Sequence, residues 1–336
     1  MIISFYNKDF EPLLNNASLL IDKNSYYLVK RPVELNDFSC VCEPFTEDIQ
    51  PTFLVVKDDR GNNKSLVYSA LAGVPVLNKD NKTEINATDL KTLFSSDVII
   101  QYGSYTNISQ VIDKIFTSWE EQVNKGSINC RIVFKDGAGA IQLTNLVPST
   151  TKAVYNALEE ISAYLNAYKL YIDSKIDLAT KEVVFTIGKI MQYDKNIKLW
   201  EYGIRDYGKW VANVNETQGY DSNFNEGIRW ILTSDNNITI TESERNIYPI
   251  KRRVFVNDDI NEANKEALTE LLNSRFNENL ELPTNDNNIN FETKFNIYLK
   301  RGGELYKRLP CGELRYNSTG LYEIQIGYRY VGVDFI

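Results

Sequence analysis

The sequence predicts a β-rich α+β fold, and three observations support this prediction. Short runs rich in β-branched and aromatic residues recur along the 336 residues, separated by clusters of Asn, Asp and Gly. Other stretches place apolar residues at every third or fourth position, the period of an amphipathic helix. The length suits roughly two or three domains of about 150 residues each. We expect a β domain over 1–100, an α+β insert with two amphipathic helices over 101–172, and a second β domain over 173–336.

The first hundred residues read as short strands joined by turns. Residues 51–57 and 65–71 are apolar extended runs, and the Asp/Gly/Asn cluster between them predicts a hairpin. Asn78 to Lys82 marks another turn, because Asn and Asp side chains bond nearby backbone and tolerate left-handed geometry.

In the insert, apolar residues recur at the three- and four-residue spacing of a helix instead of the alternation of a strand. One helix is predicted by the apolar stripe Ile108, Val111, Ile112, Ile115, Phe116 and Trp119. Asn107 or Thr106 can cap it, and Gly126 lies just beyond it. A hairpin is expected next, from residues 131–135 through the turn 136–139 to 141–143. The second helix is expected over 151–169, with these residues facing inward: Ala153, Val154, Ala157, Leu158, Ile161 and Leu165.

The remaining residues return to strands around one helix. Paired strands are expected at 170–175 with 182–188 and at 229–233 with 238–241, and single strands at 210–215, 291–299 and 321–330. The helix is predicted over 261–277 from Ala263, Ala267, Leu268, Leu271, Leu272 and Phe276. A loop rich in Asn and Asp separates it from the last strands.

Composition excludes several classes of site. The chain contains no histidine, which removes Ser-His-Asp and Cys-His arrangements and every histidine metal site. The formal charge is −8, so the net field repels phosphates and a nucleic-acid binder is not expected. The first residues lack the pattern of a signal peptide, and no apolar run is long enough to cross a bilayer. We expect a soluble product of the cytoplasm.

The four cysteines are expected to be buried thiols. Cys40 and Cys42 lie two apart in an apolar stretch, and Cys130 and Cys311 stand alone. This spacing lacks the two Cys-x-x-Cys pairs of a zinc site and does not indicate a disulfide framework.

Two short motifs imitate a serine acyltransferase. Ser149 to Lys152 matches Ser-x-x-Lys, and Ser234 to Asn236 matches Ser-Asp-Asn, but the Lys-Thr-Gly that completes such a site is missing. We therefore expect Ser149 or Thr150 to cap the second helix and Ser234 to lie in a hairpin turn. The acidic doublets are interpreted as solvated faces rather than acid/base pairs: Glu120–Glu121, Glu159–Glu160 and Asp258–Asp259.

Four other patterns have simple interpretations. Asp235 and Asp286 with their Asn neighbours suit turns better than calcium loops, which need ordered spacing. Gly137 and Gly139 lack the rest of a phosphate or dinucleotide loop, and Lys251 to Arg253 is expected to be a solvated basic edge. Aromatic residues that could stack on a sugar are expected to serve packing instead: Tyr26, Tyr27, Tyr202, Tyr207 and Trp210.

The pattern as a whole resembles the baseplate hub, or tail-associated (Tal), proteins of long-tailed phages, including the siphovirus Gp37-like family. The likeness covers most of the chain in a fixed order. It is carried by Arg31–Ser39, Ala87–Phe94, the helix near 108–123, the helix near 151–169 leading into Tyr171, Tyr248–Val256, the helix near 261–277, and Leu309–Leu314 with Ile324–Arg329.

The resemblance implies two tube-like β-barrel domains with peripheral α+β modules, assembled as a homotrimer. Two barrels per chain and three chains would match a six-fold tail tube. The implied function is a structural hub, without cofactor, catalytic or metal residues, that closes the distal end of the tail and opens for DNA passage. Because the sequence stops at Ile336, we expect the hub without an appended fibre or hydrolase.

The implied partners are a distal tail protein ring, a tape measure protein and receptor-binding proteins, with genome DNA passing through the lumen without specific binding. The implied location is the virion tail tip, after assembly in the host cytoplasm. A receptor- or carbohydrate-binding tail protein remains the alternative, and an acyltransferase or glycan hydrolase is the third hypothesis.

Overall fold

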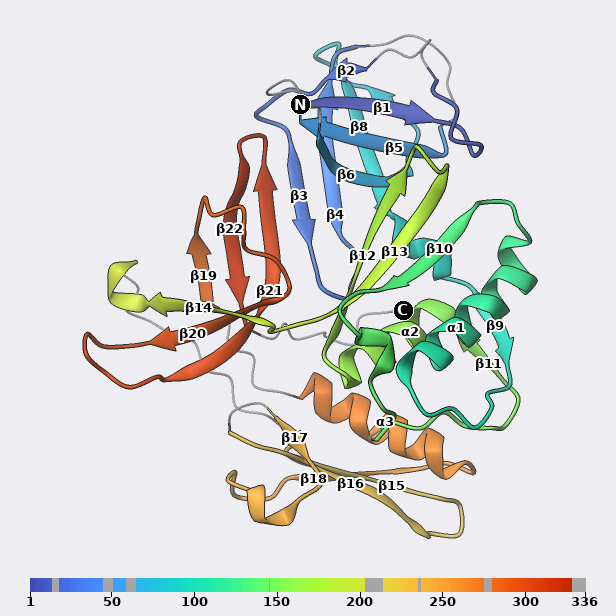
Figure 1. The fold of residues 1–336 in the computed structure, drawn as a ribbon, viewed down its shortest axis with the longest axis vertical. Coiled ribbons are helices and arrows are strands. Elements are labelled where there is room, and N and C mark those ends of the chain that lie inside the picture. Colours follow the sequence, from blue (N-terminus) through green and yellow to red (C-terminus); the bar gives the residue numbers. More distant parts are fainter. Residues whose placement is uncertain are drawn as a thin grey trace.

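The computed structural model describes residues 1–13, 18–44, 51–58, 65–144, 146–202, 214–234, 237–274 and 280–327. These residues form a β-rich α+β protein, as the sequence predicts, with several sheets and three α-helices (Figure 1). None of the helices in this part of the chain is long and apolar enough to cross a membrane.

The largest sheet contains thirteen strands from both ends of the sequence. Its amino-terminal members are β1 (Ile2–Tyr6), β2 (Leu19–Leu20), β3 (Tyr27–Lys30), β4 (Asp37–Cys42), β5 (Phe53–Asp58), β6 (Ser65–Ala72), β7 (Val76–Leu77) and β8 (Thr83–Asp89). Its later members are β14 (Tyr193–Lys198), β19 (Leu280–Pro283), β20 (Thr293–Tyr298), β21 (Lys307–Asn317) and β22 (Gly320–Ile326). Antiparallel pairing of β3 with β21 joins the two groups, with Val29 opposite Arg315.

The amino-terminal strands surround their own apolar core. The predicted hairpin is confirmed as β5 and β6, and the predicted turn after β7 is confirmed by Asn78 Oδ1, which accepts the backbone N–H groups of Asp80 and Lys82. Alternate side chains enter the core, as period two requires. Its buried members include Ile3, Phe5, Leu28, Phe38, Cys40, Leu54, Val56, Tyr68 and Ile85. An isolated bridge between Ile21 and Cys42 brings the end of β2 against β4.

The later strands surround a second, separate core. In this group β14, β20, β21, β22 and β19 lie side by side. The buried residues include Ile197, Leu282, Phe295, Ile297, Leu309, Leu314 and Ile324. The strand expected at 291–299 is β20, and that expected at 321–330 is β22, whose predicted last residues lie outside the described part of the chain.

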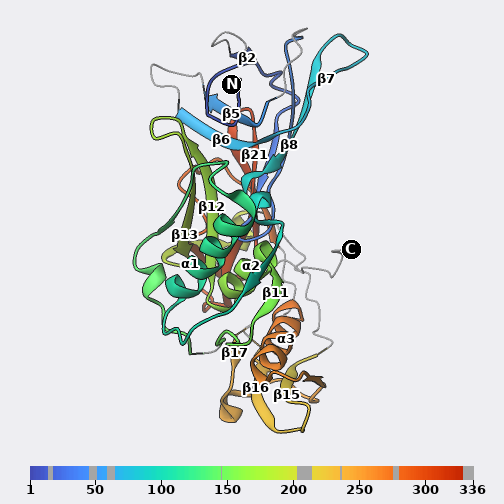
Figure 2. The same cartoon turned by 90° about the vertical axis from the view of Figure 1, so that its right-hand side faces the viewer.

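The α+β insert packs beside the large sheet (Figure 2). It contains the short helix η2 (Leu90–Phe94), β9 (Asp97–Ile100), α1 (Ile108–Trp119), β10 (Cys130–Phe134), β11 (Ala153–Asn156), α2 (Ala157–Ala167), β12 (Leu170–Asp177) and β13 (Glu182–Lys189). The first helix starts where predicted, because Asn107 and Gln110 form a reciprocal capping box. The predicted pairing of residues 170–175 with 182–188 is confirmed by β12 and β13.

Several expectations for the insert are wrong. Residues 153–156 form strand β11, paired with β9, so the second helix begins at Ala157 and Val154 is exposed rather than inward. Asn156 caps that helix, not Ser149 or Thr150. The expected hairpin after residue 131 is also absent from the described strands, because β10 pairs in parallel with the distant β13.

A smaller module lies at the opposite end of the molecule from β1 (Figure 1). It contains β15 (Glu216–Tyr220), β16 (Glu226–Leu232), β17 (Ile238–Thr239), β18 (Arg252–Val256) and α3 (Ile260–Asn273). Pairing of β16 with β17 confirms the predicted strand pair at 229–241. The helix approaches closely at Gly219, where a Cβ atom would lie 2.7 Å from Asn264 Oδ1. Most of the strand expected at 210–215, and Phe276, fall outside the described residues.

The expected domain limits stay a prediction. The limit at 172/173 falls inside β12, and the large sheet combines strands from the first and third expected domains. The two groups of strands in that sheet nevertheless keep separate cores.

Candidate functional site

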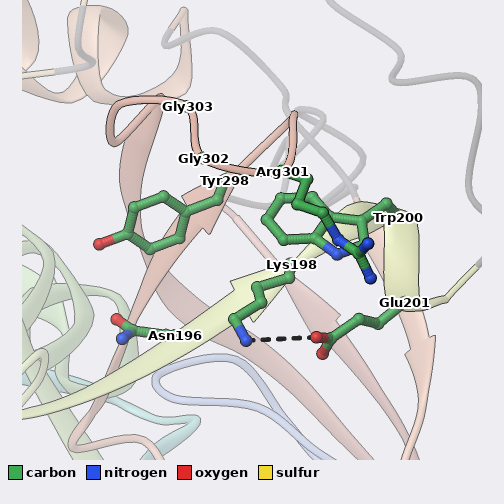
Figure 3. Close-up of a pocket in the computed structure, with 8 residues that line it drawn as sticks. All are labelled: Asn196, Lys198, Trp200, Glu201, Tyr298, Arg301, Gly302 and Gly303. Carbon is green, nitrogen blue, oxygen red and sulfur yellow. Dashed lines mark hydrogen bonds and ion pairs between the residues drawn. The ribbon is translucent and has the colours of Figure 1, made fainter.

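A surface recess lies at the outer end of the second group of strands, where β14 continues into the short helix η5 (Leu199–Glu201). The opposite wall comes from the end of β20 and the loop that follows it (Figure 3). The recess measures about 390 Å³, within the range of small-molecule sites, which is ~300–1,000 Å³. Its lining residues are Asn196, Lys198, Trp200, Glu201, Tyr298, Arg301, Gly302 and Gly303.

Strand register explains why these side chains meet. Parallel pairing of β14 with β20 sets Asn196 beside Asn296 and Lys198 beside Tyr298. Because side chains alternate along a strand, Ile197 enters the core while its neighbours face the recess. Gly302 adopts a left-handed φ of 70° in the loop beyond, a geometry that favours glycine.

Polar contacts order one side of the recess. Lys198 Nζ lies 3.2 Å from Glu201 Oε1. Asn296 Nδ2 donates to Asn196 Oδ1 at 3.1 Å, which leaves the amide N–H groups of Asn196 available to donate into the recess. Arg301 is exposed on the opposite wall.

The aromatic platform considered from the sequence does not form as a unit. Tyr26 is buried in the first core, whereas Tyr27 is exposed on β3 and Tyr202 follows η5. Tyr207 and Trp210 lie outside the described residues. The recess instead brings together Trp200 and Tyr298, which sequence reasoning missed. They are about a hundred residues apart, and only the β14–β20 register places them together.

Ser149 is not arranged as an acyltransferase nucleophile. It precedes strand β11, is buried, and donates its hydroxyl to the Asp259 carboxylate rather than meeting Lys152, which is exposed. Burial raises the pKa of Asp259, but hydrogen bonds from Ser149, from the Asn261 N–H and from Thr151 outweigh it, so the pKa lies below its usual value. Ser149 thus ties the insert to the start of α3. Of the second motif, Asp235 and Asn236 lie outside the described residues.

The solvated interpretation of the acidic doublets is wrong for Glu160. Glu159 is exposed, but Glu160 is only 3% exposed and accepts a hydrogen bond from Tyr102 Oη at 2.8 Å. Its other oxygen accepts from Lys265 Nζ on α3, and Lys265 lies 4.9 Å from the centre of the Tyr155 ring. This buried pair holds α2 against α3.

The other doublets take local roles. Glu120 accepts from Asn124 Nδ2 at 2.6 Å and from the Gly126 N–H at 3.1 Å, and so closes the end of the first helix. Asp259 caps α3 by accepting the Asn261 N–H, while Asp258 is exposed.

The turn interpretation of Asp286 is confirmed. Its carboxylate accepts the Asn288 N–H at 3.0 Å and pairs with Lys195. Asp235 lies outside the described residues. In the described ranges no group of three or more Cys, Asp or Glu side chains could hold a metal ion.

The cysteines are free thiols, as expected. Three are buried and Cys130 is half-buried. Burial raises the pKa of both Cys42 and Cys130 to about 12 and also raises those of Cys40 and Cys311.

The basic cluster is an edge of the smaller module, but two of its members are paired within the chain. Arg252 Nε lies 3.3 Å from Glu216 Oε1, and Arg253 Nη1 lies 2.7 Å from Glu270 Oε1. Lys251 is exposed. Gly137 adopts a left-handed φ of 71° in the turn after β10, which gives this glycine a conformational role.

A buried ion pair joins the first strands to the insert. Asp89 and Lys91 are both fully buried, with 3.3 Å between carboxylate and ammonium. Lys91 Nζ also donates to backbone oxygens of Val33 and Glu34 in the β3–β4 loop. Ser174 Oγ on β12 donates to Asp89 at 3.3 Å. The Asp89–Lys91 pair therefore connects three segments: the β3–β4 loop, the start of η2 and strand β12.

A charged row crosses the junction between the two groups of strands. Arg31 follows β3 and lies 3.1 Å from Glu313 of β21. Arg315 continues the row, 3.1 Å from Glu313 and 2.9 Å from Glu281 of β19. Burial lowers the pKa of Arg31, but its bonds to Asp37 and Glu313 outweigh this and raise it. These pairs reinforce the β3–β21 ladder.

Comparisons with known proteins identify the fold. No protein-family model and no curated protein sequence matches this chain. Among solved structures, the chain is similar to the prophage tail protein gp18 from Listeria monocytogenes EGD-e, with a TM-score of 0.54 and 10% identity. That match covers 99% of this chain and 96% of the other.

Two further structures are similar over most of this chain. A chain of the lidded Francisella PdpA–VgrG complex matches with a TM-score of 0.50 and 12% identity, covering 97% of this chain and 51% of that one. A chain of the phage P2 baseplate in its activated conformation matches with a TM-score of 0.46 and 10% identity, covering 97% of this chain and 98% of that one. The similarity to the prophage tail protein confirms, at the level of the fold, the resemblance to phage tail proteins seen in the sequence.

Proposed function

We propose that this chain is the structural hub of a phage tail tip, three copies of which form a ring at the distal end of the tail tube. The observation that carries the proposal is the large sheet, in which two groups of strands with separate cores are joined edge to edge by β3 and β21. Three such chains would supply six β units around one axis. The similarity to a prophage tail protein over nearly the whole of both chains supports this use of the fold.

The first group of strands is proposed to be a small barrel. Its ladder runs β2–β1–β5–β6–β8–β4. Hydrogen bonds then return from β4 to β2: the Asp22 N–H donates to Val41 O at 2.8 Å and the Glu43 N–H to Leu20 O at 3.1 Å. Closing a sheet in this way removes exposed edges and encloses a core of alternating side chains.

The second group is proposed as the matching unit of the tube. Its strands β14, β20, β21, β22 and β19 surround the second core. The smaller module with α3 and the α+β insert would then be peripheral, held by the Glu160–Lys265 and Asp89–Lys91 pairs.

The contact between copies is proposed to use the outer part of β7. Among the described strands β7 pairs only with β8, and Val74, Val76 and Leu77 are 76%, 56% and 52% exposed. Exposed apolar residues beside an unpaired strand edge favour association with another chain. In a ring, the β7 edge in the first group of strands of one copy would meet the second group of strands of the next copy.

The ring is proposed to let genome DNA pass without binding it. The chain carries a net charge of −8, which disfavours attachment to phosphates. The proposed partners are a distal tail protein ring, a tape measure protein and receptor-binding proteins, in the virion tail tip. Assembly would take place in the host cytoplasm.

Native mass spectrometry of the full chain tests the proposal. We expect a species of about 116 kDa, three times 38.6 kDa. Val76→Lys should shift the population toward monomer, because it places a charge in the proposed contact. Val254→Lys, at an equally exposed valine of the peripheral β18, is the matched control and should leave the trimer intact. A monomer at all concentrations contradicts the proposal, and equal effects of the two variants contradict the proposed contact.

A further inference from the structure

We propose that the recess beside β14 binds a saccharide that carries an acidic group. This inference does not depend on the ring. It starts from the lining, where two aromatic rings, an amide, an ion pair and an exposed arginine share one opening of about 390 Å³ (Figure 3). Each of these features matches a different part of such a ligand.

The aromatic side chains supply the apolar surface. Trp200 and Tyr298 are both half-buried, so their rings are held in place yet still reach the opening. Sugar rings present C–H faces as well as hydroxyl groups, and large rigid aromatic rings bury such faces at a small cost in entropy.

The polar groups match sugar hydroxyls, which both donate and accept. Asn196 can donate from its amide N–H groups, and its oxygen, which accepts from Asn296 Nδ2, keeps a second acceptor position. Glu201 can only accept, and its carboxylate lies 3.2 Å from Lys198 Nζ. Adjacent donors and acceptors fit the hydroxyl groups of a polyol, which both donate and accept, better than a phosphate chain, whose oxygens only accept.

The charge of the recess selects an acidic sugar. Lys198 and Glu201 neutralise each other, and Arg301 makes no ion pair or hydrogen bond within the described part of the chain. The lining therefore has a net charge of +1 on a chain whose total is −8. A guanidinium pairs with carboxylate or phosphate through two parallel hydrogen bonds. A single carboxylate or phosphate on the sugar would satisfy it.

Isothermal titration calorimetry on the full chain tests the inference with defined probes. We expect trigalacturonate to bind with a Kd of roughly 0.1–1 mM, and neutral chitotriose about tenfold more weakly. Glucose 6-phosphate distinguishes phosphate from carboxylate as the acidic group. Inorganic phosphate tests whether negative charge alone is enough for binding. AMP tests whether the recess binds a nucleotide instead of a sugar.

Variants assign the binding to the recess. Arg301→Gln should weaken trigalacturonate binding about tenfold and leave chitotriose unchanged. Tyr298→Ala and Trp200→Phe should weaken both sugars. The matched controls are Arg131→Gln and Tyr248→Ala, an exposed arginine and an exposed tyrosine in other modules, and neither should change binding.

Several results would overturn the inference. These are no binding of either acidic sugar at about 10 mM, binding of phosphate or AMP as tight as that of the acidic sugars, or equal losses in Arg301→Gln and Arg131→Gln. Native mass spectrometry of each variant, measured in parallel, shows whether the trimer is intact. A loss of sugar binding can therefore be distinguished from a failure of ring assembly.

Discussion

The buried Asp89–Lys91 pair allows a sharp prediction about what holds the first strands to the insert. Lys91→Met keeps the length of the side chain but removes its charge. The Asp89 carboxylate would stay fully buried, with only the Asn36 N–H at 2.7 Å, the Lys91 N–H at 3.0 Å and Ser174 Oγ at 3.3 Å to stabilise it. Removing one partner of a buried pair costs about 3–5 kcal/mol.

The expected effect can be measured by urea unfolding of the full chain. With a slope of about 3 kcal/mol per molar urea, the loss corresponds to a midpoint lower by about 1 M or more. The double variant Asp89→Asn with Lys91→Met should recover much of this, because it removes both charges and Asn can still cap the short helix η2.

Lys82→Met is the matched control. Lys82 pairs with Asp22 at 2.5 Å, but the two side chains are 47% and 32% exposed. Exposed pairs contribute about 0–1 kcal/mol, so this variant should scarcely move the midpoint. A Lys91→Met midpoint no lower than that of Lys82→Met would refute the reasoning.

Three further predictions follow from other buried groups. Glu160→Gln should lower the free energy of unfolding by about 1.5–3 kcal/mol, because Lys265 loses its buried partner, while exposed Glu159→Gln should stay within about 0.5 kcal/mol; equal urea midpoints would contradict this. The Asp259 pKa is lower in the folded protein than in the unfolded chain, so its stabilising effect is present above the unfolded pKa and is lost as pH falls through the folded pKa. Ser149→Ala should therefore cost about 1 kcal/mol at pH 7 and less in acid, and a cost that grows in acid would reverse the sign of the argument. Burial and the raised pKa of about 12 leave Cys42 and Cys130 with about one thiolate in ten thousand at pH 8, so a thiol reagent should react with the native protein far more slowly than in urea, and rapid native reaction would show that the thiols are open.

Local signals in the sequence predicted those elements whose stabilising contacts are also local. The first helix follows from its apolar stripe and from the predicted cap at Asn107, which forms a capping box with Gln110 in the structure. The hairpin of β5 and β6 follows from a turn cluster between two apolar runs. Their bounds could be read from the sequence because their partners lie nearby in it.

Elements decided by distant partners could not be predicted in this way. Residues 153–156 carry a helical pattern, yet they form a strand because Ala153 lies opposite Ile100 on β9. The strand β10 has a turn directly after it, yet it pairs with β13 about fifty residues later. Tertiary pairing overrides local preference in both cases.

The candidate site shows the same limit. No local pattern connects Trp200 with Tyr298 or Glu160 with Lys265, because the members of each pair are about a hundred residues apart.

Electron microscopy of the purified protein tests the central claim most directly. If three copies of this chain form a ring, class averages should show three-fold particles with a central channel and six β units around it. Monomers alone, or particles without three-fold symmetry, would contradict the account.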